Sequence, residues 1–439
     1  MTELTEISTP FEFASVEIES SAKKKKKIEI KALVTDLDIF EHIDKPYLTA
    51  QIMFRDMNDF MSGDDIRGGD IVRIKLKQTT GLMKVFVQKE FRIDKFMGSS
   101  RTDMNNNVEV HILHLIEKHW YDSTAQNVNK SYAGTATTIL PMIAKEFLDD
   151  REVESSGEDV QNMKLIVPNM TPLDAMSWIK NRVTTKDGYP FYLYSSIIKD
   201  ELQFNDLKTM MEEKPWTNKN PFSYIAAEQN DEEVARVRSI KGFKSKGTDN
   251  LLTLIDKGLV GAKHSYYDVT TNQMHHVTFD LHKDVMTRLK DDQIQKDKPF
   301  YTEDLGLEDT PFNQLISRHT TQIGGTNAYD SPQHSLNESA GEGQYRLNVI
   351  TRAMTLLTQH NPMSIVVSGI DFANKTHNSV GKTIDLAFLK TDVLNNKDNP
   401  YDQKKSGTYL IYAAKHSFKI DGYDVMLSCI KLTNGGYTL

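Results

Sequence analysis

The sequence contains little cysteine, no long apolar run and no excess of positive charge. Its one cysteine, Cys429, among 439 residues cannot form an intrachain disulfide. The first residues, MTELTEISTPFEF, lack the basic region and apolar run of a secretory signal, so we expect synthesis in a reducing cytoplasm. No apolar stretch approaches the roughly 18 residues that are needed to span a bilayer. We therefore expect neither a disulfide-stapled fold nor a membrane-spanning helix.

The charge balance argues against a protein that grips nucleic acid. The formal net charge is −8 and the isoelectric point is about 5.9, so the surface lacks the basic field that neutralises phosphates. With 38% hydrophobic residues the chain can bury more than one core, and its length suggests about two to four domains. A multidomain globular protein is the expectation.

Two short motifs resemble ligand sites but lack the required context. GKT at 381–383 resembles the end of a phosphate-binding loop, but position 376 is Thr where that loop needs Gly. The following TIDLAFL alternates like a strand, whereas the loop needs a helix. His275 and His276 are adjacent in a predicted strand, so their side chains point to opposite faces and cannot share one metal ion.

The remaining candidates are equally incomplete. The acidic stretch 149–160 has its Gly at the wrong offset for a calcium loop. His416 has no Ser or Cys elbow elsewhere in the sequence, so we expect a partly buried polar residue at a strand end. We expect no catalytic residue, no cofactor and no metal, and the sequence identifies no binding residue.

Alternating apolar residues predict a first β domain over 28–119. In DIVRIKLK, Val72, Ile74 and Leu76 fall on one face of a half-buried strand. Several such strands with polar breaks between them predict an antiparallel barrel or sandwich. The lysine run 23–27 disfavours packing, so we expect residues 1–27 to form an N-terminal arm.

Helical spacing then indicates an inserted α+β domain over 120–231. One amphipathic helix contains Ile139, Ile143 and Phe147, and we expect Thr138 to cap it so that Pro141 lies in its first turn. A second helix is expected to have Thr171 as cap, Pro172 at its first position and Asp174 in a capping box. Two strands follow in GYPFYLYSSIIKDELQFNDL.

Strand patterns return in the second half. We expect a second β domain formed by 232–280 together with 345–436, interrupted by a polar insertion over 281–344. Leu347, Ile350, Met354 and Leu357 have the spacing of one helix within this part.

The two β domains resemble each other. GGDIVRIKLK (68–77) corresponds to VGKTIDLAFLK (380–390), and each is a strand introduced by Gly. Downstream, EFRIDKF and NVEVHILHL correspond to TYLIYAAKHSF and YDVMLSCIKL. The predicted fold is mainly β, with two similar antiparallel barrels from an internal duplication and with α+β insertions.

The order of these segments resembles the baseplate hub proteins of contractile-tailed, T-even-like phages, which share their architecture with the hub half of type VI secretion spike proteins. The resemblance covers about 28–210 and 232–435. It is carried by the following stretches: DDIRGGDIVRIKLK, SYAGTATTILPMIAKEF, VPNMTPLDAMSWIKNRV, GYPFYLYSS, LQFNDL, YRLNVITRAMTLL and SGTYLIYAAKHSFKIDGYDVMLSCIKL.

This resemblance implies a structural virion protein. The resemblance also implies a trimer, in which six barrels form a ring between a hexameric tail tube and a trimeric central spike. Two barrels in each chain let a threefold object meet a sixfold one. The implied partners are the spike, tube or tube-initiator proteins, tape measure protein and baseplate wedge proteins, and DNA would pass through the lumen without specific binding.

Two alternatives remain open at the sequence level. Another tail component built on the same barrel, such as a tube initiator or distal tail protein, would need only one barrel. A cell-wall hydrolase would need a pair of acids in the 120–225 region, and no such pair is evident. The sequence also lacks spike repeats, so the resemblance implies that the spike is a separate protein.

Overall fold

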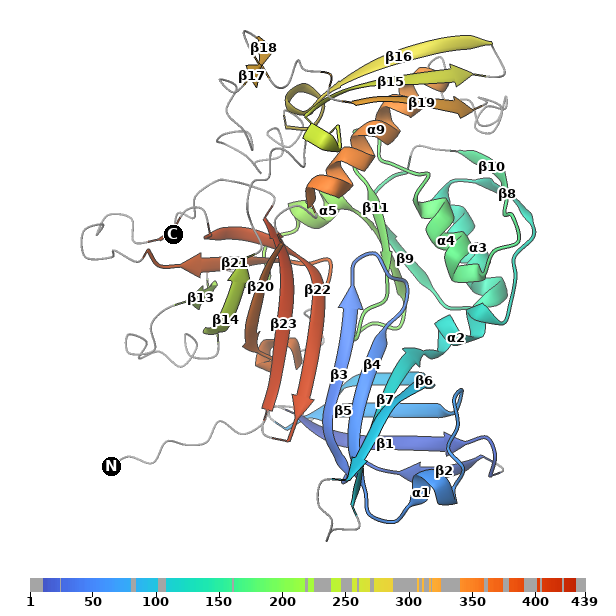
Figure 1. The fold of residues 1–439 in the computed structure, drawn as a ribbon, viewed down its shortest axis with the longest axis vertical. Coiled ribbons are helices and arrows are strands. Elements are labelled where there is room, and N and C mark those ends of the chain that lie inside the picture. The colour runs from blue at the N-terminus through green and yellow to red at the C-terminus, as the bar shows by residue number, and fades with distance from the viewer. Residues whose placement is uncertain are drawn as a thin grey trace.

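Strands dominate the protein, and one 13-stranded sheet contains strands from both halves of the sequence (Figure 1). The mainly β class expected from the sequence is confirmed. The computed structural model describes residues 11–23, 25–79, 84–101, 108–159, 162–217, 220–224, 238–245, 255–258, 260–268, 272–286, 306–307, 310–311, 316, 318–324, 340–358, 362–373, 379–390, 401–402, 405–420 and 422–431. Within these residues, no helix combines the length and the apolar character that crossing a membrane requires.

The first half of the sheet has the strand order β1-β5-β6-β7-β4-β3, with a short β2 beside β1. Its elements are β1 (Phe11–Ser20), β2 (Lys26–Glu29), β3 (Val34–His42), β4 (Thr49–Asp56), α1 (Phe60–Gly63), β5 (Ile71–Gln78), β6 (Val85–Arg101) and β7 (Glu109–Glu117). Val72, Ile74 and Leu76 are fully buried on one face of β5, as their alternation predicts.

The expected N-terminal arm over 1–27 is wrong for the part that the structure describes. Strand β1 pairs antiparallel with β5, and its Val16 and Ile18 are fully buried. The lysine run does not prevent packing here, because the alternating FEFASVEIES that precedes it buries its own apolar face. Residues 1–10 lie outside the described residues.

The second half of the sheet has the order β21-β22-β23-β20-β14, and β13 pairs with β21. Its elements are β13 (Phe222–Tyr224), β14 (Ile240–Ser245), β20 (Pro362–Ser368), the 3₁₀ turn η5 (Ile370–Ala373), β21 (Thr383–Phe388), β22 (Gly407–Lys419) and β23 (Gly422–Lys431). Cys429 is fully buried in β23, and its burial raises the pKa of the thiol well above its usual range.

The two halves repeat the same arrangement. The order β5-β6-β7-β4-β3 recurs as β21-β22-β23-β20-β14, and a short helical turn follows both β4 and β20. One bulge also coincides: β6 and β22 break register between Ile93 and Lys95 and between Ile411 and Ala413, and β6 has a further bulge between Phe96 and Gly98 that β22 lacks. Since bulges are specific features of a strand pair, the shared position supports the predicted internal duplication.

A left-handed glycine introduces the matching strands in both repeats. Gly69 (φ 90°) donates its N–H to Ile93 O at 2.7 Å, and Gly381 (φ 80°) donates to Ile411 O at 3.0 Å. Glycine adopts this conformation without the strain that a side chain would bring. The glycine of GKT therefore belongs to a turn before a strand, and β21 follows it directly.

The region after β7 forms an α+β body with its own hydrophobic cluster, and its Leu207 and Met210 join the main core. Two small sheets, β10-β8 and β11-β12-β9, accompany its helices, on the right of Figure 1. Its elements are α2 (Lys118–Thr124), β8 (Ser131–Gly134), α3 (Ala136–Phe147), β9 (Val153–Ser156), β10 (Met163–Ile166), α4 (Pro172–Lys180), β11 (Phe191–Tyr194), β12 (Leu202–Asp206) and α5 (Leu207–Glu212).

One predicted helix start is confirmed and the other is wrong. Thr171 caps α4, Pro172 is the first helical residue, and the Thr171 hydroxyl donates to the Asp174 carboxylate at 2.7 Å. Helix α3 begins at Ala136, so Pro141 lies inside the helix and not in its first turn. The early start depends on a distant residue, because the Asp159 carboxylate accepts the Ala136 N–H at 2.5 Å.

The expected extent of the second β domain also needs a correction. Strands β15 (Gly261–Asp268) and β16 (Gln273–Asp280) pair with β19 (Arg318–Gly324) in a sheet of three strands, not with the barrel strands. Helix α9 (Ala340–Thr358) contacts β15 and β16, and a π-helical turn η2 (His282–Met286) follows β16. The short strands β17 (Gly306–Leu307) and β18 (Thr310–Pro311) pair with each other, and most of 287–339 lies outside the described residues.

Candidate functional site

Strand β22 joins the two halves of the large sheet. Its first part pairs with β21, and its second part pairs antiparallel with β3, from Ala413 opposite His42 to Lys419 opposite Asp36. Strand β23 pairs along the opposite edge of β22, from Tyr409 to Lys419. The bulge in β22 lies where the strand passes from β21 to β3, so the junction between the halves is built into the strand itself.

The bulged residue Tyr412 makes the first contacts of this junction. Its carbonyl accepts the Ile43 N–H at 2.9 Å, and its hydroxyl lies 2.7 Å from His42 Nε2. The Asp44 N–H donates to His42 Nδ1 at 3.0 Å, so Nδ1 carries no proton and Nε2–H donates to Tyr412. Burial and the nearby Lys45 lower the pKa of His42, which favours this neutral ring.

A buried cluster of polar side chains lies deeper in the same junction; we name it the Glu41 cluster and define it as Glu41, Ser379, His416 and Tyr423. Glu41 Oε2 accepts a hydrogen bond from His416 Nε2 at 3.0 Å and a second one from the Ser379 hydroxyl. Its other oxygen accepts the Ile197 N–H at 2.5 Å. One carboxylate thus connects β3, β22, the segment before β21 and the inserted α+β region.

Tyr423 completes the cluster on the far side of the imidazole. Its hydroxyl lies 2.8 Å from His416 Nδ1. Burial and the charge of Glu41 raise the pKa of Tyr423 well above its usual value, so the hydroxyl keeps its proton and can donate to Nδ1. Burying polar groups without partners is costly, and here each ring nitrogen of His416 has one.

The Glu41 cluster does not have the geometry of a catalytic triad. In a triad the serine and the carboxylate contact opposite nitrogens of the histidine. Ser379 and Glu41 both face Nε2, at 3.3 and 3.0 Å, and Nδ1 faces Tyr423. Ser379 and His416 are fully buried and Glu41 is 2% exposed, so no substrate reaches them. The cluster therefore positions the two halves of the sheet relative to each other.

His416 is more deeply buried than the sequence suggested. We expected a partly buried residue at a strand end, but it lies in the interior of β22 with no exposed surface. Its partner Glu41 comes from the other repeat, so spacing along the chain could not reveal the pair. The sequence carries one signal for Glu41: an acidic residue on the same face of β3 as the apolar Leu37 and Ile39, both of which are buried.

A buried ion pair connects the first half of the sheet to the inserted region. The Arg151 guanidinium donates to Glu117 Oε1 at 2.8 Å and to the Ser195 hydroxyl at 3.1 Å. Burial raises the pKa of Glu117, but Arg151, with smaller contributions from His119 and Lys89, more than offsets it and holds that pKa well below its usual range. Glu117 stays charged at neutral pH and ties the end of β7 to the inserted region.

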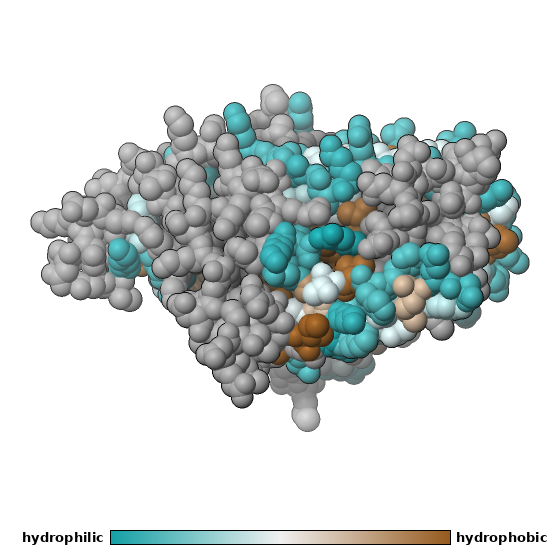
Figure 2. Space-filling model, turned by 90° about the horizontal axis from the view of Figure 1, so that it is seen from above, coloured by the Kyte–Doolittle hydropathy of each residue, from teal (hydrophilic) through white to brown (hydrophobic). Residues whose placement is uncertain are grey.

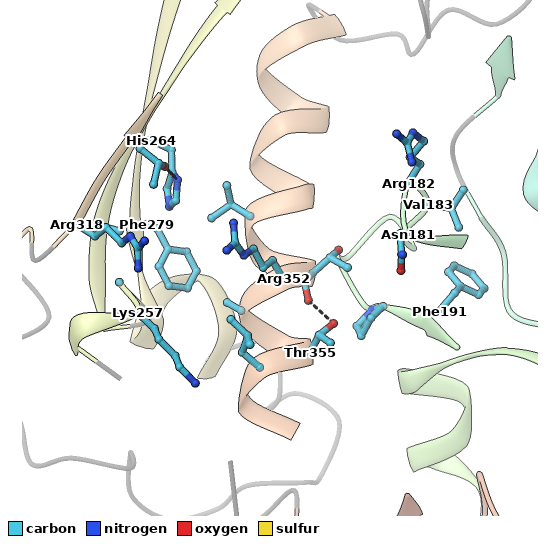
Figure 3. Close-up of a pocket in the computed structure, with 18 of the residues that line it drawn as sticks. Asn181, Arg182, Val183, Phe191, Lys257, His264, Phe279, Arg318, Arg352 and Thr355 are labelled. Carbon is cyan, nitrogen blue, oxygen red and sulfur yellow. Dashed lines mark hydrogen bonds between the residues drawn. The ribbon is translucent and has the colours of Figure 1, made fainter. Parts of the chain in front are cut away.

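A cavity of about 700 Å³ lies between the three-stranded sheet, α9 and the end of α4. Figure 3 shows Arg352 and Thr355 on α9, between His264 and Arg318 on one side and Asn181 and Arg182 on the other. Among the residues that Figure 2 colours at this end, hydrophilic side chains predominate, with small hydrophobic areas between them.

The chemistry of this cavity is basic. Its lining contains the following cationic side chains: Lys180, Arg182, Lys257, Arg318 and Arg352. Among the described residues that line the cavity, Asp44 is the one carboxylate, and Lys180 Nζ lies 2.5 Å from it. Burial, together with Arg352 and His319, lowers the pKa of His264. Glycan hydrolysis usually uses two carboxyl groups, and the described lining residues supply one.

The two metal-like motifs of the sequence, His275 with His276 and the acidic stretch 149–160, do not form metal sites among the described residues. His275 and His276 are neighbours in β16, and the Ser265 hydroxyl lies 2.9 Å from His276 Nδ1. The part of the chain that the structure describes contains no group of three or more His, Cys, Asp or Glu side chains suited to a metal ion. Within 149–160, β9 forms and Glu154 pairs with Lys199 at 2.5 Å.

Comparison with solved structures relates this architecture to known proteins. The 43 kDa tail protein of prophage MuSo2 from Shewanella oneidensis matches with a TM-score of 0.50 and 11% identity over 95% of this chain and 98% of its own. A tail protein from Neisseria meningitidis matches with a TM-score of 0.51 and 10% identity over 96% of both chains. The chain has the fold of phage tail proteins.

Both of these tail proteins are matched over nearly their full lengths, and neither is described as an enzyme. An E. coli type VI secretion component, described as structurally similar to bacteriophage T4 tail proteins, gives a TM-score of 0.41 at 9% identity over 92% of this chain and 76% of its own. The two tail proteins matched over nearly their full lengths confirm, at the level of the fold, the resemblance read from the sequence. No protein-family model and no curated protein sequence matches the chain.

Proposed function

We propose that the chain is a structural hub of a phage tail baseplate, which forms a homotrimer between the tail tube and the central spike. The observation that carries this proposal is the repeat of one strand arrangement in both halves of a sheet joined at β3 and β22. Three copies would present six similar units to a sixfold tube and three identical faces to a threefold spike. The phage-tail fold of two solved neighbours supports it.

The joined halves also suit a rigid adaptor. The Glu41 cluster and the Glu117–Arg151 pair connect three parts of the chain through buried contacts. Buried polar groups with several partners favour one arrangement over others, because each alternative leaves a charge without its partner. A hub that transmits force between tube and spike needs such fixed placement of its two repeats.

The remaining parts of the proposal extend the resemblance. The channel of the trimer would let DNA pass without specific binding, in keeping with a net charge of −8. Proposed partners are the spike, tube or tube-initiator proteins, tape measure protein and wedge proteins, and the proposed location is the tail baseplate of a virion. We further propose that 28–119, 120–231 and 345–436 mark the main body of the first repeat, the inserted domain and the end of the second repeat.

Measuring the mass of the purified chain by light scattering, alone and mixed with a candidate spike protein, tests the proposal. A trimer, or a complex of three chains with three spike chains, is the expected result. A chain that stays monomeric and binds no spike would contradict the hub function. A position away from the tail axis in a virion map would favour the tube-initiator or distal-tail alternative, and clear activity against cell walls would favour a hydrolase.

A further inference from the structure

Two strand edges of the large sheet have no partner strand among the described residues. The outer part of β6, residues 94–101, pairs with β7 on one side only, because β5 ends its pairing at Arg92. Strand β14 pairs with β20 on one side, and β13 touches only its beginning, by a single bridge at Ser239. An open strand edge presents unpaired N–H and C=O groups, which are suited to pairing with another chain.

The repeat identifies these two edges as counterparts of the ones that join the halves. Strand β22 corresponds to β6, and its second part pairs with β3. Strand β14 corresponds to β3, since both end the matching strand order and both carry a bulge at their start, after Ile240 and after Val34. The structure therefore contains one complete junction and the two separated halves of a second one.

Apolar side chains at both open edges support the same conclusion. Phe96 and Met97 on β6 are 48% and 53% exposed. Phe243 on β14 is 37% exposed, and the buried side of its ring packs against Tyr224 and Phe388. In Figure 1, β14 lies at the left and β6 to the right beside β7, and among the described residues no pairing joins these two strands within the chain. Exposed apolar residues on an unpaired strand are typical of a surface that another chain covers.

We propose that the outer part of β6 of one copy pairs antiparallel with β14 of a second copy, in the way that β22 pairs with β3 within the chain. The proposal rests on the trimeric hub proposed above and names the surface that would hold the trimer together. Each copy carries one edge of each kind, so the contact is head-to-tail and forms a ring if the rotation closes. Three copies would alternate three internal junctions with three between copies.

The register of this pairing follows from the internal junction. Ser417 lies opposite Asp38 within the chain, and the Ser417 hydroxyl donates to the Asp38 carboxylate. Through their partner strands, Ser417 corresponds to Ser100 and Asp38 corresponds to Lys244. Ser100 of one copy is thus expected opposite Lys244 of the next, and Arg101 is expected opposite Phe243.

The contact between copies lacks part of what stabilises the internal junction. Ser99 stands at the β6 position that corresponds to His416, because their partners His111 and Val425 are matching residues of β7 and β23. The imidazole that bonds to Glu41 and Tyr423 therefore has no equivalent at the open edge. A weaker contact of this kind suits an assembly that forms from separate folded copies.

Cysteine pairs across the proposed contact provide the test. The double variant Ser100→Cys with Lys244→Cys should form disulfide-linked dimers and trimers under oxidation, seen on a denaturing gel without reductant. Asp38→Cys with Ser417→Cys is the matched positive control, which should cross-link within one chain. Ser100→Cys with Lys241→Cys, placed out of register, is the negative control. The native Cys429 is fully buried, so it does not compete.

A second measurement uses single variants of exposed apolar residues. Phe243→Lys should weaken trimer formation at least about tenfold in light scattering, because it places a charge in the covered edge. Ile420→Lys, at a residue that is 69% exposed and lies on neither open edge, should leave assembly unchanged. Circular dichroism checks that both variants fold.

The outcomes separate this proposal from the hub function. A trimer that forms without cross-links in the Ser100 and Lys244 variant, and that Phe243→Lys leaves intact, overturns the edge pairing but not the hub. A chain that is monomeric at every concentration and with a spike overturns both. Cross-links that extend to long ladders without an end support the pairing but contradict closure into a trimer.

Discussion

The two repeats share their strand order but differ at the edges and in the loops. Strand β1 has 10 residues and runs antiparallel to β5, whereas its counterpart β13 has 3 residues and runs parallel to β21. A short turn joins β3 to β4, but β15, β16, β19 and α9 all lie between β14 and β20. The strands that carry the shared core kept their arrangement, and change accumulated where the chain reaches the surface.

The junction shows what this difference allows. In the second repeat β22 carries His416, which bonds to Glu41 of the first repeat, while the first repeat has Ser99 at the matching place. Duplicated strands can thus serve two purposes: one edge is fixed inside the chain and its counterpart stays open. The following predictions test how far the two repeats differ.

Removing the Glu41 carboxylate should have the largest effect. Glu41→Ala leaves His416, Ser379 and the Ile197 N–H without their buried acceptor, and we expect the free energy of unfolding to fall by about 3 to 5 kcal/mol. Ser99→Ala, at the exposed position that matches His416, should change it by less than about 0.5 kcal/mol. Urea unfolding of both variants measures the difference, and equal losses would contradict the assigned role of the cluster.

Replacing Glu117 should produce a loss of stability that depends on pH. Because its pKa in the folded protein lies below the ordinary value of 4.5, the ionised carboxylate stabilises the fold above that pH, and the contribution is lost as the pH falls through the folded pKa. Glu117→Gln should cost about 3 kcal/mol at pH 7, since Arg151 keeps a buried charge without its partner.

The pH profile separates this effect from a simple packing defect. The difference between the wild-type protein and Glu117→Gln should shrink below pH 4.5 and stay constant above it. Chemical unfolding at a series of pH values gives the measurement. A difference that is the same at acid and neutral pH would show that the charge is not the cause.

Alanine substitutions at the matching glycines, Gly69 and Gly381, should lower the stability of the protein by different amounts. Both Gly69 and Gly381 have positive φ, so alanine adds strain at either position. At Gly381 the new methyl group meets Tyr194, which is buried and bonded to Asn205, whereas at Gly69 it meets the half-exposed Tyr121, which can move. We expect Gly381→Ala to cost about 2 kcal/mol and Gly69→Ala about 1 kcal/mol. Thermal unfolding of the pair provides the comparison.

The partly exposed ion pair between Lys415 and Asp38 at the junction should contribute least to stability. Lys415 Nζ lies 2.9 Å from Asp38, and both side chains are partly exposed to solvent. Lys415→Ala should therefore lower the free energy of unfolding by about 0.5 kcal/mol, and added salt should reduce the effect. A double-mutant cycle with Asp38→Ala measures the pair itself; a coupling above about 2 kcal/mol would contradict this ranking.

Local patterns predicted much of the fold because their physics is local. Alternation located β5, and the residues Thr171, Pro172 and Asp174 located the start of α4, since a cap needs only its own first turn. Likeness between the strands around 68–115 and 380–432 predicted the duplication. The predicted start of α3 was wrong because a distant residue decides it: Asp159 supplies the acceptor that lets the helix begin before Thr138.

Alternation and composition were enough to predict the mainly β class and the repeat, because both depend on neighbours along the chain. The folded structure was needed to show that β22 crosses from one repeat to the other, that His416 contacts Glu41, and that β15 pairs with β19. These contacts join residues far apart in the sequence. Their free energy comes from burial and from satisfied hydrogen bonds that no local pattern encodes.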